Sequence, residues 1–443
     1  MKKFLPIILL ILISTFLIFY RFADIPKNLA FDEVEFTKLA LSLDKKPYAP
    51  YSQLATGHST LYFYILLASL KTFGINTFAL RFPAAIFGIL SIIIFYLIIK
   101  RVFKQSSNEA MKQFLPFLLT LILLSSRWFL NFSRFSFEAT FLLFLELTSI
   151  YFILQFSEII KATTPFLRKS PGAPMGVWRS KKTVSSFYLI ASGFFSGLAF
   201  LSYTPGRIFF LLPLSFLVFK LVNSLTRKQF DNKIIKQLLC FVIPFIIIIT
   251  PLTNYLINNT DTRVDQQFFL KNNEMTVNEK ISGLWKNISS TALMFDVKGD
   301  VNGRHNYPNK PALNPILGIL FVIGLVITMK QWNNNNNKLF LLYFLLSIFP
   351  ALMTYPWENP NMLRTFTVLP SIVFFIGNAI IILWTATSKI FKNKKMFVSC
   401  FLFLVILFSS YYELRTYFKY QSTVFKQSFE IKLPLEKAIK FNP

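Results

Sequence analysis

The sequence is poor in the residue types that build disulfide-linked, metal-binding or nucleotide-binding domains. Its 443 residues include 2 cysteines, 2 histidines and 14 glycines, and Asp and Glu together number 20. Cys240 and Cys400 both lie inside apolar runs, which leaves no disulfide framework or cysteine metal site. The chain also has no GxGxxG segment and no P-loop, so the usual phosphate-cradling nucleotide loops are absent.

Apolar residues and cations are abundant instead. The chain is 54% hydrophobic and 17% aromatic, with a mean hydropathy of +0.51 and a net charge of +27. Runs such as Ile89–Ile99 and Phe241–Ile249 are apolar on every face, as expected inside a membrane and not in a soluble core. The cations sit in short loops between these runs, where membrane orientation explains them better than nucleic-acid binding does.

Eleven apolar runs are long enough to cross a bilayer, which needs roughly 17–25 residues. The first run follows Met1-Lys2-Lys3 and resembles a signal peptide, but no small-residue cleavage site comes after it, so we expect an uncleaved first span. The expected spans are residues 4–20, 80–99, 113–130, 138–157, 184–202, 206–224, 237–257, 314–330, 339–354, 365–386 and 396–412.

A twelfth run, 59–74, decides the topology, because every later loop changes side with it. It is short and interrupted by Lys71. If it does not cross, the N-terminus and alternate loops on one side carry 23 Lys and Arg but only two acids, Glu109 and Asp231, which marks the cytoplasmic side. We therefore expect 59–74 to be an amphipathic helix on the outer surface. The N-terminus is then cytoplasmic and the C-terminus outside.

The predicted fold is an all-α membrane protein with one polytopic domain. This domain covers residues 1–412 and includes two large outer loops, 21–79 and 258–313. The outer tail 413–443 is too short to form a core of its own.

Acidic residues in the first outer loop are the first candidate site. Asp32 and Glu33 are adjacent, so on a helix they diverge by about 100° and only one can face a given site. The alternative is an acidic first helical turn stabilised by the helix dipole. A second candidate is the short turn that contains Arg134 and Glu138; here the alternative is a snorkelling arginine and a helix cap.

Further candidates carry positive charge or lie within the membrane. Arg364 enters the tenth span from outside, and its planar guanidinium suits phosphate oxygens; Arg207 is similar, and His58 begins the surface helix. Snorkelling or capping are the alternatives for these three residues. Glu146 lies two turns deeper than Glu138 on the same helix face, where a carboxyl must be neutral or paired.

On the expected topology these groups gather on the outer side, apart from Glu146 at depth. Carboxylates and cations at a lipid surface suit an anionic, lipid-linked substrate. A carboxylate can take the proton of an attacking hydroxyl, and cations can stabilise a departing phosphate.

The chain resembles the polyprenyl-phosphate-sugar-dependent glycosyltransferases of the GT-C fold, which include the protein O-mannosyltransferases (glycosyltransferase family 39) and the aminoarabinose transferases that act on lipid A. The matching segments occur in the same order between about residue 5 and residue 390. They are Asp32-Glu33, the stretch Gly57–Phe63, the stretch Leu80–Gly88, the Ser-Arg turn ending at Glu138, His305–Pro308 with Asn314-Pro315, and Arg364 with Pro370.

The resemblance implies roles for individual residues. Asp32 matches the catalytic base or acceptor-orienting acid, and Glu138 matches a second active-site acid that is usually Asp. Arg364 matches a cation that holds the donor phosphate, with His58, Arg134 and Arg207 as further phosphate-binding candidates. Glu33 and Tyr62 are candidate substrate-binding residues.

The expected activity is transfer of a sugar, with inversion, from a polyprenyl monophosphate to a lipid, glycan or protein acceptor on the outer face of the cell membrane. No cofactor or metal is required, although the acids of 32–35 leave a divalent ion possible. A transporter or flippase for lipid-linked sugars is the alternative, which would show charges along the bilayer path. A non-catalytic scaffold with the same fold is a third possibility.

Overall fold

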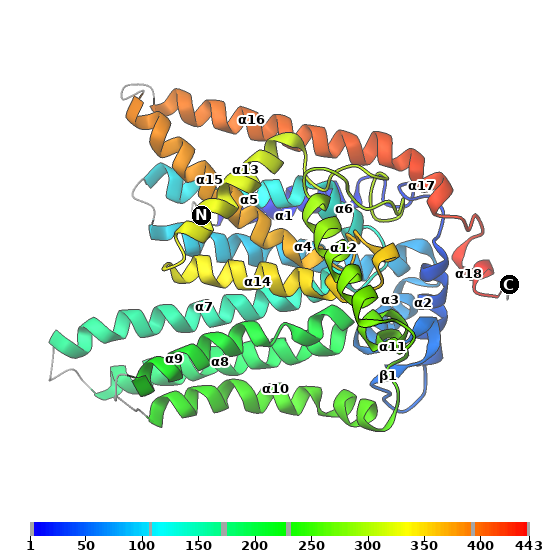
Figure 1. The fold of residues 1–443 in the computed structure, drawn as a ribbon, viewed down its shortest axis with the longest axis horizontal. Helices are drawn as coiled ribbons and strands as arrows, with labels where there is room; N and C mark the ends of the chain where they lie inside the picture. Colours follow the sequence, from blue (N-terminus) through cyan, green and yellow to red (C-terminus); the bar gives the residue numbers. More distant parts are fainter. Residues whose placement is uncertain (1–3, 106–108, 170–174, 227–231, 391–394, 441–443) are drawn as a thin grey trace.

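The computed structural model describes residues 4–105, 109–169, 175–226, 232–390 and 395–440. Long helices run side by side along the longest axis of the molecule (Figure 1). These helices are α1 (Leu5–Phe19), α4 (Thr77–Val102), α5 (Glu109–Ser125), α7 (Ala139–Lys169), α8 (Met175–Ser202), α9 (Leu211–Thr226), α10 (Asn232–Asn258), α13 (Pro315–Lys330), α14 (Asn335–Leu352), α15 (Leu369–Ile390) and α16 (Lys395–Arg415).

The remaining elements connect these helices. The α-helices among them are α2 (Phe31–Ser42), α3 (Leu61–Phe73), α6 (Arg127–Ser133), α11 (Thr262–Gln267), α12 (Val277–Met294), α17 (Ser422–Ser428) and α18 (Leu435–Ala438). The 3₁₀ turns are η1 (Leu54–Thr56), η2 (Phe103–Gln105), η3 (Thr204–Ile208), η4 (Phe269–Lys271), η5 (Pro356–Glu358) and η6 (Phe366–Val368), and η7 (Thr416–Gln421) is a π-helical segment. The strands β1 (Tyr51–Ser52) and β2 (His58–Ser59) form one small hairpin.

The bundle confirms a multi-pass membrane protein. Among the described residues, six helices are long and apolar enough to cross a bilayer, or seven if the bent pair α5 and α6 forms one span. The helices α1, α3 and α13 are apolar but shorter. The expected total of eleven crossings therefore stays a prediction.

The expected straight span 113–130 is bent by 64° between α5 and α6. The break lies at Ser126, whose ψ of 126° is not helical. Immediately after it, the Arg127 guanidinium donates to both Glu413 oxygens, at 3.0 and 2.8 Å. The bend thus turns a buried arginine toward α16, a contact that hydropathy alone cannot reveal.

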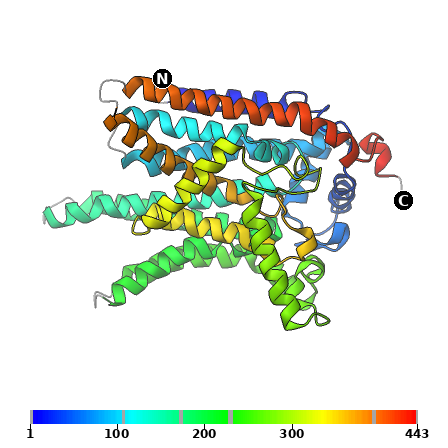
Figure 2. The same ribbon diagram turned by 45° about the horizontal axis from the view of Figure 1, so that its top comes forward.

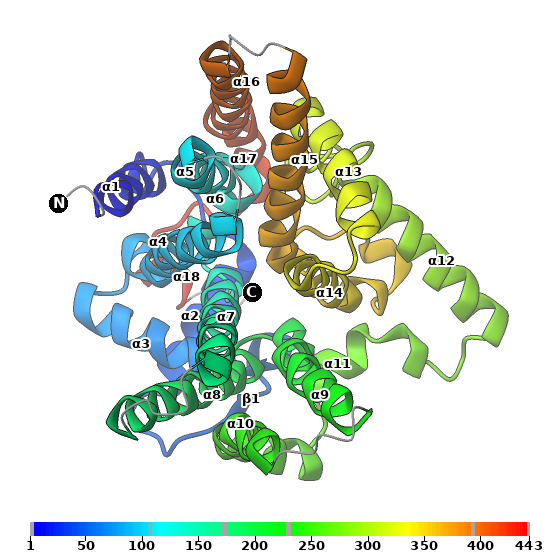
Figure 3. The same ribbon diagram turned by 90° about the vertical axis from the view of Figure 1, so that its left-hand side faces the viewer.

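The two ends of the bundle differ. The helices α2, α3, α11, α17 and α18 gather at one end, called the loop end from here on, whereas the N-terminus and the turn between α13 and α14 lie toward the other (Figure 1). Figure 3, which looks along the bundle, shows α3 lying crosswise to the long helices at the edge of the bundle. That 59–74 rests on the outer membrane surface stays a prediction. Parts of the expected cytoplasmic loops, 106–108, 170–174, 227–231 and 391–394, lie outside the described residues.

The second large loop and the tail cover the loop end. Figure 2 shows α12 crossing this end of the bundle beside α11. Residues of the tail return to the first loop, where Leu29 and Ile431 exchange backbone hydrogen bonds of 2.9 and 3.0 Å. The tail thus pairs with the chain at Leu29, which precedes Asp32 by three positions.

Candidate active site

A polar cavity of about 400 Å³ opens at the loop end. Its walls come from segments far apart in the sequence, so only the folded chain creates it. They are the start of α2, the hairpin turn before β2, Tyr203, α11, residues 300–305 and residues 357–364.

Asp32 lies in the first turn of α2 and lines this cavity. Its side chain is 41% exposed, and its Oδ2 accepts a 2.6 Å hydrogen bond from Nη1 of Arg304. The positive end of the helix dipole also favours an ionised carboxylate at this position. Asp32 is thus an accessible carboxylate held by one cation.

Glu33 points away from the cavity into the protein. Its two oxygens accept 2.8 Å bonds from Nε and Nη2 of Arg81, and both side chains are completely buried. Glu33 also accepts from the backbone N–H of Ala30 at 3.1 Å and of Ser136 at 3.3 Å. The two adjacent acids diverge as expected, and Glu33 fixes the start of α2 without lining the cavity.

His58 links the cavity to a buried acid. It follows Gly57, whose φ of +93° belongs to the left-handed region that favours glycine. His58 Nδ1 lies 2.6 Å from Glu138 Oε1, and Arg263 Nη1 lies 2.5 Å from His58 Nε2 and 3.0 Å from its Nδ1. A proton on Nδ1 lets the ring donate to the carboxylate and accept at Nε2 from the arginine. Burial lowers the pKa of His58, and the Arg263 charge lowers it further against the opposing effect of Glu138. The imidazole is therefore neutral at neutral pH.

Glu138 itself is fully buried and does not line the cavity. It reaches the cavity only through His58, so the structure brings this expected acid close to the site but behind the histidine. Its second oxygen has no hydrogen-bond partner among the described residues.

Arg364 also lines the polar cavity. The amide of Asn361 orders its turn, accepting from the backbone N–H of Leu363 at 3.1 Å and of Arg364 at 3.0 Å. The guanidinium pairs with Glu358 and donates to the Thr354 hydroxyl at 3.4 Å.

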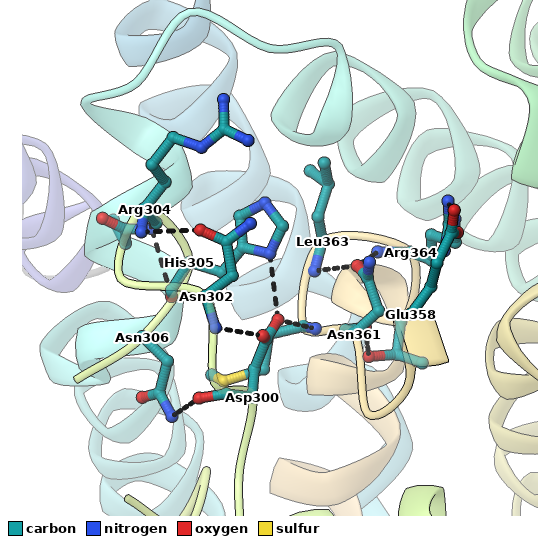
Figure 4. Close-up of polar contacts among 12 residues, drawn as sticks. Asp300, Asn302, Arg304, His305, Asn306, Glu358, Asn361, Leu363 and Arg364 are labelled. Atoms are coloured by element: carbon teal, nitrogen blue, oxygen red, sulfur yellow. Dashed lines mark hydrogen bonds and ion pairs between the residues drawn. The ribbon is translucent and has the colours of Figure 1, made fainter. Parts of the chain in front are cut away.

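Asp300 joins this turn to the loop that carries Arg304 (Figure 4). Its carboxylate accepts from the backbone N–H of Asn302 at 2.8 Å, from His305 Nδ1 at 2.9 Å and from the backbone N–H of Met362 at 2.8 Å. This buried acid thereby fixes two cavity walls relative to each other.

An apolar cavity of about 200 Å³ adjoins the polar one. Four residues line both cavities: Tyr203, Arg263, Gln267 and Arg364. Most of the other lining side chains are apolar, including Ile208, Phe349 and Met353. Arg263 and Arg364 therefore lie at the junction of the polar cavity and the apolar cavity.

Three other expected site residues lie outside the polar cavity. Arg134 is completely buried and donates to the backbone oxygens of Leu17, Ile18, Tyr20, Arg21 and Ile25 around the end of α1, at 2.6–3.3 Å. Arg207 pairs with Asp261, the cap of the short helix that carries Arg263. Tyr62 is buried in α3. In the structure these three side chains contact other parts of the protein and do not line the polar cavity.

Glu146 lies in α7, within the bundle. Its Oε2 accepts a 2.7 Å hydrogen bond from the Tyr343 hydroxyl of α14, and both side chains are buried. The carboxyl therefore has a specific polar partner at depth, as a buried acid requires. Among the described residues, no three His, Cys, Asp or Glu side chains are grouped so that they could hold a metal ion.

Sequence reasoning missed Arg263, Arg304 and Asp300. All three lie in the second large loop, 258–313, outside its longest helix α12 and in segments where no motif marks a site. The one signal was the resemblance of His305–Pro308 to the family's second loop, which pointed to the region without selecting a residue.

No protein-family model and no curated protein matches the sequence. Among solved structures, ArnT from Cupriavidus metallidurans bound to undecaprenyl phosphate aligns over 98% of this chain and 77% of its own, at 11% identity and a TM-score of 0.53. The chain has the GT-C fold.

Two further GT-C structures come from Archaeoglobus fulgidus. The oligosaccharyltransferase AglB, in complex with an inhibitory peptide and a dolichol-phosphate, aligns at 15% identity with a TM-score of 0.52. The apo oligosaccharyltransferase aligns at 14% identity with a TM-score of 0.51. This chain covers 97% and 94% of its own length in these alignments but only 56% and 55% of the neighbours. The expected GT-C fold is thus confirmed.

Proposed function

We propose that this protein is a membrane glycosyltransferase that moves a sugar from a polyprenyl monophosphate carrier to an acceptor. The observation that carries the proposal is the junction of the two cavities. An isoprenoid chain needs an apolar groove, and its phosphate needs cations at the groove's polar end. Arg263 and Arg364 lie at that junction. The neighbours bound to undecaprenyl phosphate and dolichol-phosphate support the same ligand class.

The reaction proposed is an in-line displacement with inversion. The acceptor hydroxyl attacks C1 of the sugar, the bond from C1 to the phosphate oxygen breaks, and Asp32 takes the hydroxyl proton. Arg364 and Arg263 stabilise the negative charge on the departing polyprenyl phosphate. Glu138 acts as a positioning residue, because its hydrogen bond fixes the tautomer of His58 that accepts from Arg263.

The membrane placement also belongs to this proposal. With the basic loops in the cytoplasm, the loop end faces outward and the donor's sugar reaches the cavity from the outer leaflet of the cell membrane. The acceptor is a lipid, glycan or protein on that side. The sugar is a hexose or a pentose.

Transfer in proteoliposomes tests the proposal. Purified protein receives radiolabelled polyprenyl-phosphate sugars and an envelope extract as the source of acceptors. The expected result is label leaving the carrier for an extract component. Intact donor that exchanges between leaflets without loss of its sugar would instead favour a transporter and contradict the proposal.

A further inference from the structure

The loop that carries Arg304 is fixed by several hydrogen bonds to its backbone and to the neighbouring His305 ring. The Asp300 carboxylate accepts from Asn302 and His305 within the loop and from Met362 outside it. From α6, the Asn131 amide donates to the carbonyls of Arg304 at 2.7 Å and His305 at 3.2 Å. A fixed backbone thus presents one long, charged side chain to the cavity, as Figure 4 shows.

The Arg304 guanidinium is largely unused by the protein. It makes one side-chain contact among the described residues, from Nη1 to Asp32 Oδ2, whereas a guanidinium carries five N–H donors. Asp32 likewise has no protein partner for Oδ1 within the described chain. Both groups are partly exposed, and such a pair contributes little to stability. The pair therefore offers free donors beside a free carboxylate oxygen.

Arg304 also stands apart from the cations at the cavity junction. Arg263 and Arg364 line both cavities, but Arg304 and Asp32 line the polar one alone. In Figure 4, Arg304 and Arg364 lie on opposite sides of Leu363. In an inverting displacement the nucleophile enters opposite the departing phosphate, so Arg304 stands with the base on the acceptor side.

We infer that Arg304 recognises the acceptor, and that the acceptor carries an anionic group, a phosphate or a carboxylate, beside its attacking hydroxyl. This inference rests on the proposed glycosyl transfer. An arginine fork binds either anion through paired hydrogen bonds. Without a cation there, Asp32 would repel such an acceptor.

The test divides an envelope extract by anion exchange into neutral and acidic fractions before each is offered to the protein with labelled donor. The expected result is label incorporated from the acidic fraction. Hydrofluoric acid treatment, which removes phosphate esters, and carbodiimide amidation, which neutralises carboxylates, then show which anion is needed. Incorporation from the neutral fraction, or activity that survives both treatments, would overturn the inference.

Variants separate recognition from folding. Arg304→Gln should raise the KM for the acidic acceptor about tenfold or more, as expected for a lost charged hydrogen bond, and leave polyprenyl phosphate binding unchanged. Arg304→Lys should recover part of the affinity. The matched control is Arg21→Gln, which alters an exposed arginine paired with Asp24 away from the cavity. An unchanged acceptor KM in Arg304→Gln would refute the role.

A different result would show that the proposed glycosyl transfer itself is wrong. If wild-type protein neither binds polyprenyl phosphate nor releases label from the donor with either fraction, the proposed function falls and the inference falls with it. If the protein binds the donor and transfers label to acceptors of the neutral fraction, the inference about Arg304 is wrong but the proposed function stands.

Discussion

Two sets of arginines near the loop end differ in how many protein acceptors their guanidinium groups engage. Arg81, Arg127 and Arg134 are buried, and each spreads its nitrogens over carboxylate or backbone oxygens. Arg263, Arg304 and Arg364 line the polar cavity and engage few protein acceptors. We infer that an arginine supports the fold when the protein uses most of its N–H donors and is available to a ligand when few of them are used.

The physical reason is desolvation. A guanidinium taken out of water must recover its hydrogen bonds inside the protein, or folding bears a cost of several kcal/mol. The buried arginines meet that requirement and have nothing left for a ligand. The cavity arginines use fewer of their donors within the described protein and line a polar cavity, so a phosphate in that cavity can bind them. Substitutions in both sets test this division.

Arg81→Met should destabilise the fold by about 3–5 kcal/mol, because it leaves the buried Glu33 carboxylate without a cation. Thermal unfolding in detergent, monitored by loss of monodisperse protein, measures the change. The double variant Arg81→Met/Glu33→Leu should recover much of the loss. If Arg81→Met melts at the same temperature as the wild type, the buried ion pair does not stabilise the fold as stated here.

Arg364→Gln should weaken polyprenyl phosphate binding by roughly 10–100-fold, the effect of losing a charged hydrogen bond. The melting temperature should stay close to that of the wild type, since the residue's partners are Glu358 at the cavity and a long contact to Thr354. Equilibrium binding of polyprenyl phosphate to detergent-solubilised protein provides the measurement. Arg364→Lys, which keeps the charge, should fall between the two. Equal affinity in all three proteins would remove Arg364 from the phosphate site.

Arg263→Gln should shift the acid limb of the transfer–pH profile to higher pH. Burial and the Arg263 charge lower the pKa of His58 in the folded protein, so its imidazole stays neutral until the pH falls below the ordinary value near 6.5. The stability that depends on neutral His58 is likewise lost as the pH falls through this lowered pKa. Without Arg263 the pKa rises, and activity is lost from a higher pH downward.

Transfer rates between pH 5 and 8 measure this shift, and His58→Gln should remove the limb altogether. If the acid limb of Arg263→Gln does not shift, the charge of Arg263 does not set the pKa of His58.

Arg21→Gln should have the smallest effect. Arg21 and Asp24 have side chains that are 54% and 57% exposed, and exposed pairs contribute at most about 1 kcal/mol. Melting temperature and donor binding should both match the wild type. A large loss in either would mean that exposure and donor count do not sort these arginines.

The sequence predicted the fold class and several neighbours of the cavity, for identifiable reasons. Hydropathy and loop charge set the segment 59–74 apart from the expected spans, and its helix α3 is shorter than a typical span; its place on the outer surface stays a prediction. The adjacency of Asp32 and Glu33 predicted that one acid would face away. Arg134 was misleading, because a turn between two spans exposes or buries its arginine depending on tertiary contacts. Its partners are backbone oxygens of α1, which no local pattern encodes.

The missing part of the site comes from long-range contacts. Arg263 meets His58 across 205 positions and Arg304 meets Asp32 across 272. Neither arginine belongs to a periodic segment or a motif, so no short window of sequence selects it. The break at Ser126 is similar, since Glu413 lies 286 positions from Arg127.

The most direct test of the central claim compares wild-type protein with Asp32→Asn in proteoliposomes that contain labelled polyprenyl-phosphate sugar and the envelope extract. The amide keeps the shape of the carboxylate but cannot take the acceptor's proton, and loss of a general base costs about 10²–10⁴-fold in rate. The account predicts transfer reduced to that extent, with polyprenyl phosphate bound as tightly as by the wild type. Transfer at the wild-type rate by Asp32→Asn would contradict it.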